Sequence, residues 1–152
     1  AYLLDAIERA AARADRRREF VDEAVAAREE IRRTGMVLRG ADVHAYFEAK
    51  RAGKNPAPPK PVDPVNYSRR ALADLERLEE AASGASKLIE GAVTVLDEHP
   101  LIGRPVELGL RELVISRGKT GDLALYDYDE VHDEVTVLSV RHQREVDCEE
   151  SA

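Results

Sequence analysis

The sequence has few of the residues that build disulfide frameworks, zinc sites or membrane spans. Its 152 residues include no Trp, one Met, two Phe and one Cys. The lone Cys148 lies in an acidic C-terminal stretch, which excludes an internal disulfide and a zinc site built from several cysteines. No apolar run approaches the roughly eighteen residues of a membrane span, and no signal segment opens the chain. These absences predict a cytoplasmic protein with no membrane association, no metal and no cofactor.

The net charge of -7 is divided unevenly along the chain. Residues 1–62 carry thirteen Lys and Arg against ten Asp and Glu, a net charge of +3. Residues 63–152 carry ten against twenty, a net charge of -10. Opposite charges favour encounter and orientation between two surfaces, although chance variation between solvated faces would give the same division.

A proline-rich stretch separates the two parts. The sequence GKNPAPPKPVDP, residues 53–64, holds five of the seven prolines. Proline lacks the amide donor and fixes its backbone angle, so this stretch is predicted to be extended polyproline II that spans about 30 Å. The predicted organisation is therefore an arm (1–53), a linker (54–64), a compact domain (65–146) and an acidic tail (147–152).

The arm is predicted to be helical. Apolar residues recur three, four and seven positions apart over residues 3–33 and form a narrow, Ala-rich stripe. A Thr-Gly pair ends this helix, and a second helix is predicted over residues 42–51, with Asp42 as its N-cap. Neither helix can bury a core by itself, so the arm needs a surface to lie on.

The compact domain is predicted to be α+β. A short strand at residues 65–67 precedes a helix capped by Ser68, and a second helix follows a turn at residues 83–86. Three strand-like runs follow: LRELVIS, LALYDY and VTVLSV. The helical hairpin must cover one face of the antiparallel sheet, since neither layer covers itself.

Five blocks of this domain carry a family resemblance. YSRRALADLERL, HPLIGRP, GLRELVIS, ALYDYD and VRHQRE, in this order and spacing, resemble a toxin of the RelE/ParE superfamily, closest to its ParE-like branch. The resemblance implies a helical hairpin packed on a small antiparallel sheet. The sequence departs from the pattern between Glu79 and Lys87, where it is about two helical turns shorter.

The arm resembles the C-terminal part of a ParD-type antitoxin of the ribbon-helix-helix class. YLLDAIERA is similar to the second helix of that DNA-binding fold, and EFVDEAVAAREEIRRTG with GADVHAYFEA is similar to the toxin-wrapping segment. The ribbon strand and first helix do not appear in the sequence, which begins with Ala1, so the resemblance implies DNA binding only through a missing N-terminal part. Antitoxin and toxin are normally separate chains, so the junction predicts a fusion, natural or engineered to keep the toxin silent.

The superfamily contains ribosome-dependent mRNA nucleases and inhibitors of DNA gyrase. A nuclease needs a general base, a general acid and cations on the scissile phosphate. His142 is the best acid by side-chain type, but its context RHQRE resembles the gyrase-inhibitor branch. The candidate residues for contacting the target are Arg111, Arg117, Arg141, His142 and Arg144.

The charge of the domain favours one of these chemistries. A domain of net charge -10 is repelled by the phosphates of the ribosome. We therefore expect no catalytic residue and a protein target, with DNA gyrase implied by the resemblance. The alternatives are a RelE-like mRNA endoribonuclease held inactive by the arm and an interaction protein that is not toxic.

The arm is expected to neutralise the domain by helix-in-groove binding, and it can add a strand through Val37 and Leu38. The tether makes this contact intramolecular, with an effective concentration on the order of mM if it can span the two sites. If it cannot, arms exchange between two chains and a homodimer results. The predicted anchors are Val21, Val25, Ile31, Val37, Leu38, Val43, Tyr46 and Phe47.

Overall fold

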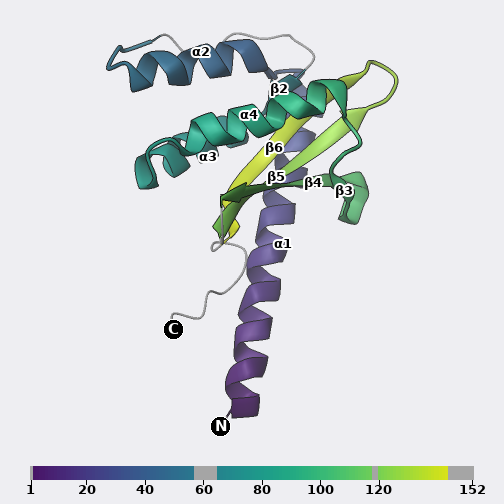
Figure 1. The fold of residues 1–152 in the computed structure, drawn as a ribbon. Helices are drawn as coiled ribbons and strands as arrows, with labels where there is room; N and C mark the ends of the chain where they lie inside the picture. The colour runs from purple at the N-terminus through teal and green to yellow at the C-terminus, as the bar shows by residue number, and fades with distance from the viewer. Residues whose placement is uncertain (1, 57–64, 118–119, 144–152) are drawn as a thin grey trace.

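The computed structural model describes residues 2–56, 65–117 and 120–143. Most of the predicted linker, together with Arg144 and the acidic tail, lies outside these residues. The fold is α+β, with a six-stranded sheet in the order β1-β2-β6-β5-β4-β3. The helical hairpin lies on one side of the sheet and the long first helix on the other (Figure 1).

The first part of the chain folds as two helices with a short strand between them. They are α1 (Tyr2–Thr34), β1 (Leu38–Arg39) and α2 (Gly40–Arg51). The predicted first helix is confirmed, including its end at Thr34 and Gly35. The amide of Gly35 donates to the carbonyl of Ile31 at 2.6 Å, and its φ of 70° takes the chain out of the helix.

The predicted N-cap of the second helix is wrong. The cap is the extended Arg39, and Asp42 lies inside the first turn, where its carboxylate is 3.9 Å from the guanidinium of Arg39. The helix begins earlier because Gly40 packs directly on the neighbouring strand. A Cβ built at Gly40 would lie 2.4 Å from the carbonyl oxygen of Val65, so only glycine permits this approach.

The second part contains the predicted strand, helical hairpin and three-stranded antiparallel meander. Its elements are β2 (Val65–Tyr67), α3 (Arg69–Ala81), α4 (Ala85–Glu98), β3 (Arg104–Pro105), a 3-10 turn (Glu107–Gly109), β4 (Arg111–Arg117), β5 (Thr120–Asp129) and β6 (Glu134–His142). Ser68 caps α3, as predicted, by accepting the amide proton of Ala71 at 3.0 Å. The short turn between the helices is held by Glu79, whose carboxylate accepts from the amides of Gly84 and Ser86.

The sheet separates two apolar clusters. β4, β5 and β6 pair antiparallel, β2 joins β6 in parallel, and β1 extends the sheet by pairing antiparallel with β2. One cluster joins the sheet to α2, α3 and α4, with Phe47, Leu75 and Ile89 fully buried. The other joins the sheet to α1, with Phe20 and Leu125 fully buried. The arm therefore contributes to both clusters.

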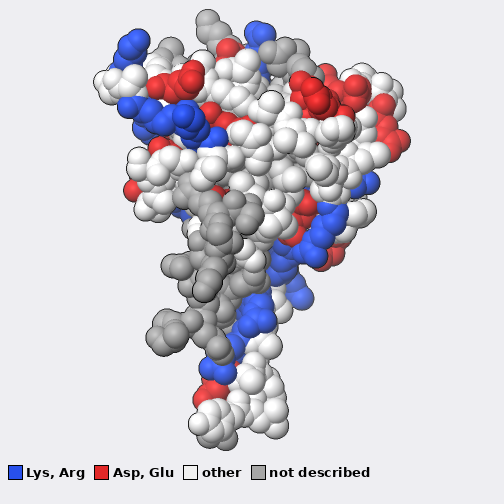
Figure 2. Space-filling view, viewed as in Figure 1, with Lys and Arg blue, Asp and Glu red and all other residues white. Residues whose placement is uncertain are grey.

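The N-terminal end of α1 extends past the sheet (Figure 1). Leu3 is 75% exposed and Ile7 is 57% exposed, so the described residues leave this end of the predicted apolar stripe largely uncovered. Figure 2 shows Lys and Arg side chains along the same projecting part of the helix. Among the described helices, none has the length and apolar character to cross a membrane.

Candidate functional site

The candidate site is the sheet face that lies under α1. Arg141, on β6, is 9% exposed. Its guanidinium lies 2.6 Å from the Glu23 carboxylate and 3.8 Å from that of Glu19, and it stacks 5.7 Å from the ring centre of Phe20. Glu19, Phe20 and Glu23 all belong to α1, so this helix covers the arginine and supplies two carboxylates to it.

A second ion pair of opposite polarity lies on the other side of Phe20. The Arg17 guanidinium on α1 is 5.9 Å from the same ring and pairs with the carboxylate of Glu112 on β4. Glu112 is 2% exposed, and its other oxygen pairs with Arg104 at 2.6 Å. The arm thus offers a cation to the domain at one point and carboxylates at another, with a buried aromatic ring between them.

The network continues from the sheet into the helical hairpin. Glu23 also accepts from Arg70 at 2.8 Å, and the same Arg70 lies 3.2 Å from Asp74. Burial raises the pKa of Asp74, while the amide of Val140, at 2.9 Å from its carboxylate, and the nearby arginines act against that rise. Glu23 is therefore linked, through Arg70 and Asp74, to the backbone next to Arg141.

The arm makes a separate contact through α2. Arg51 donates to Ser86 at 2.6 Å and lies 3.4 Å from the carboxylate of Glu90 on α4. Burial raises the pKa of Glu90, and the hydrogen bond and charge of Arg51 act against that rise. Tyr46 donates to Glu76 on α3 at 2.9 Å. These bonds hold α2 against both helices of the hairpin.

The structure separates the candidate target-contacting residues. Arg141 pairs in register with Leu123 and His142 with Asp122, so the two neighbouring side chains point to opposite faces of the sheet. Arg117 belongs to the same end of the sheet through its pairing with Thr120. The described residues contain no cluster of three or more His, Cys, Asp or Glu that could hold a metal ion.

Arg111 lies at the other end of β4 and has a different environment. Its guanidinium donates to the carbonyls of Gly103 at 2.7 Å and Leu101 at 3.2 Å. The hydroxyl of Tyr126 holds the same loop, since it accepts from the Gly103 amide at 2.9 Å and donates to the Pro100 carbonyl at 2.8 Å. Arg111 is thus engaged in fixing a loop, and Arg144 lies outside the described residues.

The predicted arm anchors occupy both clusters and the edge of the sheet. Val21, on α1, is buried against the sheet, with Val25 and Ile31 partly buried beside it. Val43 and Phe47 are fully buried, Tyr46 and Leu38 are partly buried around them, and Leu38 pairs with Tyr67 in the sheet. Val37 lines a cavity at the end of α1.

Several contacting residues were missed by the sequence reasoning. They are Phe20 and Ala27 in the apolar contact, and Arg17, Glu23 and Arg51 in the polar contact. Phe20 stands next to Val21, but the predicted stripe runs through Val21 and Ala24, and spacing alone does not show that Phe20 also faces the sheet. The sequence contains a signal for this contact: an arginine cluster and a Glu-x-x-x-Glu pair flank Phe20, so charged residues of both signs surround an aromatic side chain.

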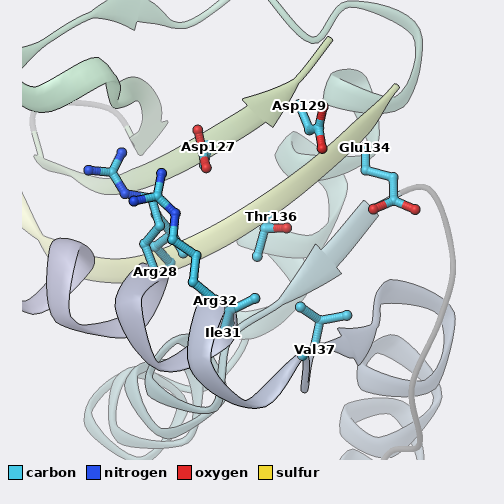
Figure 3. Close-up of a pocket in the computed structure, with 10 residues that line it drawn as sticks. Arg28, Ile31, Arg32, Val37, Asp127, Asp129, Glu134 and Thr136 are labelled. Atoms are coloured by element: carbon cyan, nitrogen blue, oxygen red, sulfur yellow. The ribbon is translucent and has the colours of Figure 1, made fainter. Parts of the chain in front are cut away.

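A cavity of about 420 Å³ separates the C-terminal end of α1 from the sheet (Figure 3). Arg28 and Arg32 line it from α1, and Asp127 and Glu134 line it from β5 and β6. Arg28 donates to the carbonyl of Leu108 at 2.9 Å. The close contact of α1 with the sheet is therefore concentrated around Phe20, and its end is less tightly packed.

Comparison with known proteins relates the second part of the chain to toxins. The sequence model of the family described as ParE toxin of type II toxin-antitoxin system, parDE, matches residues 65–147. A chain in the crystal structure of the toxin-antitoxin complex RelBE2 from Mycobacterium tuberculosis is 28% identical, with 52% of this chain and 95% of that chain covered and a TM-score of 0.38. No curated protein matches the sequence.

Proposed function

Because the chain belongs, through residues 65–147, to the ParE toxin family of type II toxin-antitoxin systems, we propose that it is an antitoxin–toxin fusion. Residues 65–146 form the toxin domain, and the ParD-like arm of residues 1–53 neutralises it. When free, the domain inhibits growth in the cytoplasm by binding a protein target, DNA gyrase, without catalysing a reaction.

The observation that carries the proposal is the cover that α1 places on Arg141. This arginine is 9% exposed, and the arm supplies two carboxylates to it, those of Glu19 and Glu23. A buried arginine needs such partners, because an unpaired buried charge costs several kcal/mol. If the arm served only to stabilise the fold, an apolar contact at this position would give more folding stability than a buried ion pair.

The geometry favours a binding surface over a nuclease site. A nuclease would need His142 and an arginine on the same phosphate, yet Arg141 and His142 point to opposite faces of β6. Arg111 is engaged with loop carbonyls at the far end of β4. The net charge of -10 over residues 63–152 also opposes entry into a phosphate-rich site.

The first test compares cells that express the full chain with cells that express residues 65–152. We expect growth arrest only from the shorter chain, together with loss of gyrase supercoiling by the purified protein and intact mRNA on ribosomes. Cleaved mRNA with normal supercoiling would instead identify a nuclease. Equal growth of the two cultures would contradict both toxin mechanisms and favour the third alternative, an interaction protein that is not toxic.

The second test addresses the end of the sheet. Replacing His142 and Arg144 together, His142→Ala with Arg144→Ala, tests whether this end of the sheet contacts the target: loss of toxicity of the short chain, with unchanged circular dichroism and thermal unfolding, would place the contact there. The matched control is Lys87→Ala, an exposed cation on α4 at a distance from this surface. Full toxicity of the double variant would place target contact elsewhere on the domain.

A further inference from the structure

The sheet face under α1 would expose apolar side chains to water if α1 did not cover it. Its floor consists of leucines that are all at most 6% exposed with α1 in place: Leu110, Leu123, Leu125 and Leu138. Without the helix, these side chains would form a continuous apolar patch, which water disfavours. Arg141 would also lose both of the acidic partners that α1 provides.

The floor is flanked by charges of opposite sign. Arg141 on β6 and Arg70 on α3 lie at one side, where both contact Glu23. Glu112 on β4 lies at the other side, where it accepts from Arg17 of the arm. Glu112 would repel a phosphate backbone, and the leucines have no polar group that could bind a phosphate. The combination therefore fits a protein surface better than a nucleic acid.

The way α1 fills this face defines what can fill it. Phe20, Ala24 and Ala27 are 0%, 0% and 5% exposed, so an aromatic side chain is followed at four and seven positions by small ones. The small residues let the helix axis approach the sheet, while the aromatic ring occupies the space between the two ion pairs. Carboxylates stand one position before and three positions after the ring, at Glu19 and Glu23.

We propose that this face is the docking surface for the target of the free toxin domain, and that the target presents a helix of the same chemistry. That helix carries an aromatic residue with carboxylates at the preceding position and three positions later, and small residues at four and seven positions after the ring. The arm then neutralises by occupying the surface that the target needs. The proposal rests on the proposed function and specifies the partner of the same domain.

The experiment uses the full chain with its arm weakened. The variant Phe20→Ala with Glu23→Gln removes the ring and one carboxylate from α1 and changes no residue of the toxin domain. We expect it to inhibit supercoiling by purified gyrase, whereas the parent chain does not. Adding Arg141→Gln to this weakened chain is expected to raise the concentration for half-inhibition by about tenfold or more, the size of a lost charged hydrogen bond.

Lys87→Gln in the same weakened chain is the matched control, because it removes an exposed cation from α4, and it should change the half-inhibition concentration by less than about twofold. If Arg141→Gln also has no effect, the proposed docking surface is wrong although the toxin works. If the weakened chain does not inhibit gyrase at all, the proposed function fails first, and the two failures are thus distinguishable.

A second measurement does not depend on the folding of the Arg141 variant. Leu123→p-benzoylphenylalanine, in the weakened chain with Arg141 intact, places a photoreactive ring in the floor of the face. Irradiation with gyrase is expected to give a crosslink to a gyrase helix with the stated pattern. A crosslink to a segment without an acidic pair, a crosslink to DNA, or no crosslink by a variant that still inhibits gyrase would each overturn the proposal.

Discussion

Glu23 accepts from two arginines that belong to different elements of the toxin domain, Arg70 at 2.8 Å and Arg141 at 2.6 Å. Glu23→Gln leaves both guanidinium groups without this carboxylate, so we expect the free energy of unfolding to fall by about 2 kcal/mol. Glu29→Gln is the matched control, since Glu29 pairs only with the exposed Arg32 at 2.8 Å on the same helix, and its cost should stay below about 0.5 kcal/mol. Urea unfolding measures both, and equal losses would show that Glu23 is no more than a surface charge.

His44 gives the contact of α2 a dependence on pH. Its Nε2 lies 2.9 Å from the hydroxyl of Tyr67, within hydrogen-bonding distance, and burial raises the pKa of that tyrosine, so its hydroxyl keeps the proton. Burial, and then the charge of Arg51, lower the pKa of His44 below its usual 6.5. The folded protein therefore binds fewer protons than the unfolded chain in this range, and stability is complete above pH 6.5 and falls as the pH drops below it.

We accordingly expect the midpoint of urea unfolding to decline between about pH 6.5 and pH 5. The variant His44→Gln keeps an acceptor for Tyr67 and has no titrating ring, so its midpoint should decline less. The exposed His132 is the control, because it pairs with Asp129 at 2.7 Å, which raises its pKa and gives the opposite sign. A decline of the same size in His44→Gln and in the parent chain would assign the pH dependence to other groups.

At the scale of elements, the junction of β1 with α2 depends on the absence of a side chain at Gly40. An added Cβ would lie 2.4 Å from the Val65 carbonyl oxygen, so Gly40→Ala must push α2 away from β2 and is expected to cost about 1 to 3 kcal/mol. Gly91→Ala on α4 meets nothing within 4 Å and is expected to stabilise by up to about 1 kcal/mol through helix propensity. Thermal unfolding of the two variants should therefore shift in opposite directions, and a shift in the same direction would show that the Gly40 contact can relax.

Periodicity predicted the elements of the chain better than it predicted their contacts. The helix of residues 2–34, the Ser68 cap and the three antiparallel strands follow from apolar spacing and turn residues, which act locally. The length of α1 that contacts the sheet does not follow from apolar spacing, because spacing identifies a face of a helix but not where the partner surface ends. Leu3 and Ile7 lie on the predicted stripe and are exposed, while Phe20 is the buried centre.

The N-cap at Asp42 failed for a related reason. The residue type is right for a cap, but the start of α2 is set by a contact with β2, which is distant in the sequence. The candidate site was predictable only in part for the same reason. The sequence offers Arg141 as a candidate for contacting the target, but its contacts with Glu19 and Glu23 become visible only when the sheet and α1 are brought together.

At the scale of the whole molecule, the arm holds the toxin domain from two sides. α1 lies on one face of the sheet, and β1 with α2 lies on its edge and against the hairpin on the other face. The division of charge into +3 and -10 matches this arrangement only in part, because the central ion pairs have both polarities. Net charge therefore assists the encounter, and the individual pairs around Phe20 define the fit.

The proposed neutralisation is intramolecular, because the tether joins the arm to the domain, and it should therefore not depend on protein concentration. We expect the intact chain to remain a monomer in light scattering over a hundredfold dilution and to leave gyrase active throughout. A protease site can be placed in the linker, residues 57–64. At high concentration the cleaved protein should still not inhibit gyrase. On dilution, however, the cleaved protein should lose its arm and begin to inhibit supercoiling, because the effective concentration on the order of mM no longer applies.

Light scattering of the intact chain separates a tethered monomer from chains that exchange arms. Exchanged arms would give a dimer before cleavage, and its mass in light scattering would fall with dilution even in the intact chain. The control is an uncut chain with the same inserted site, which isolates the effect of chain scission from that of the insertion. Inhibition by the cleaved protein that does not change over the dilution range would mean that the arm does not neutralise by reversible binding, and the contacts of Phe20 and Glu23 would then have only a structural role.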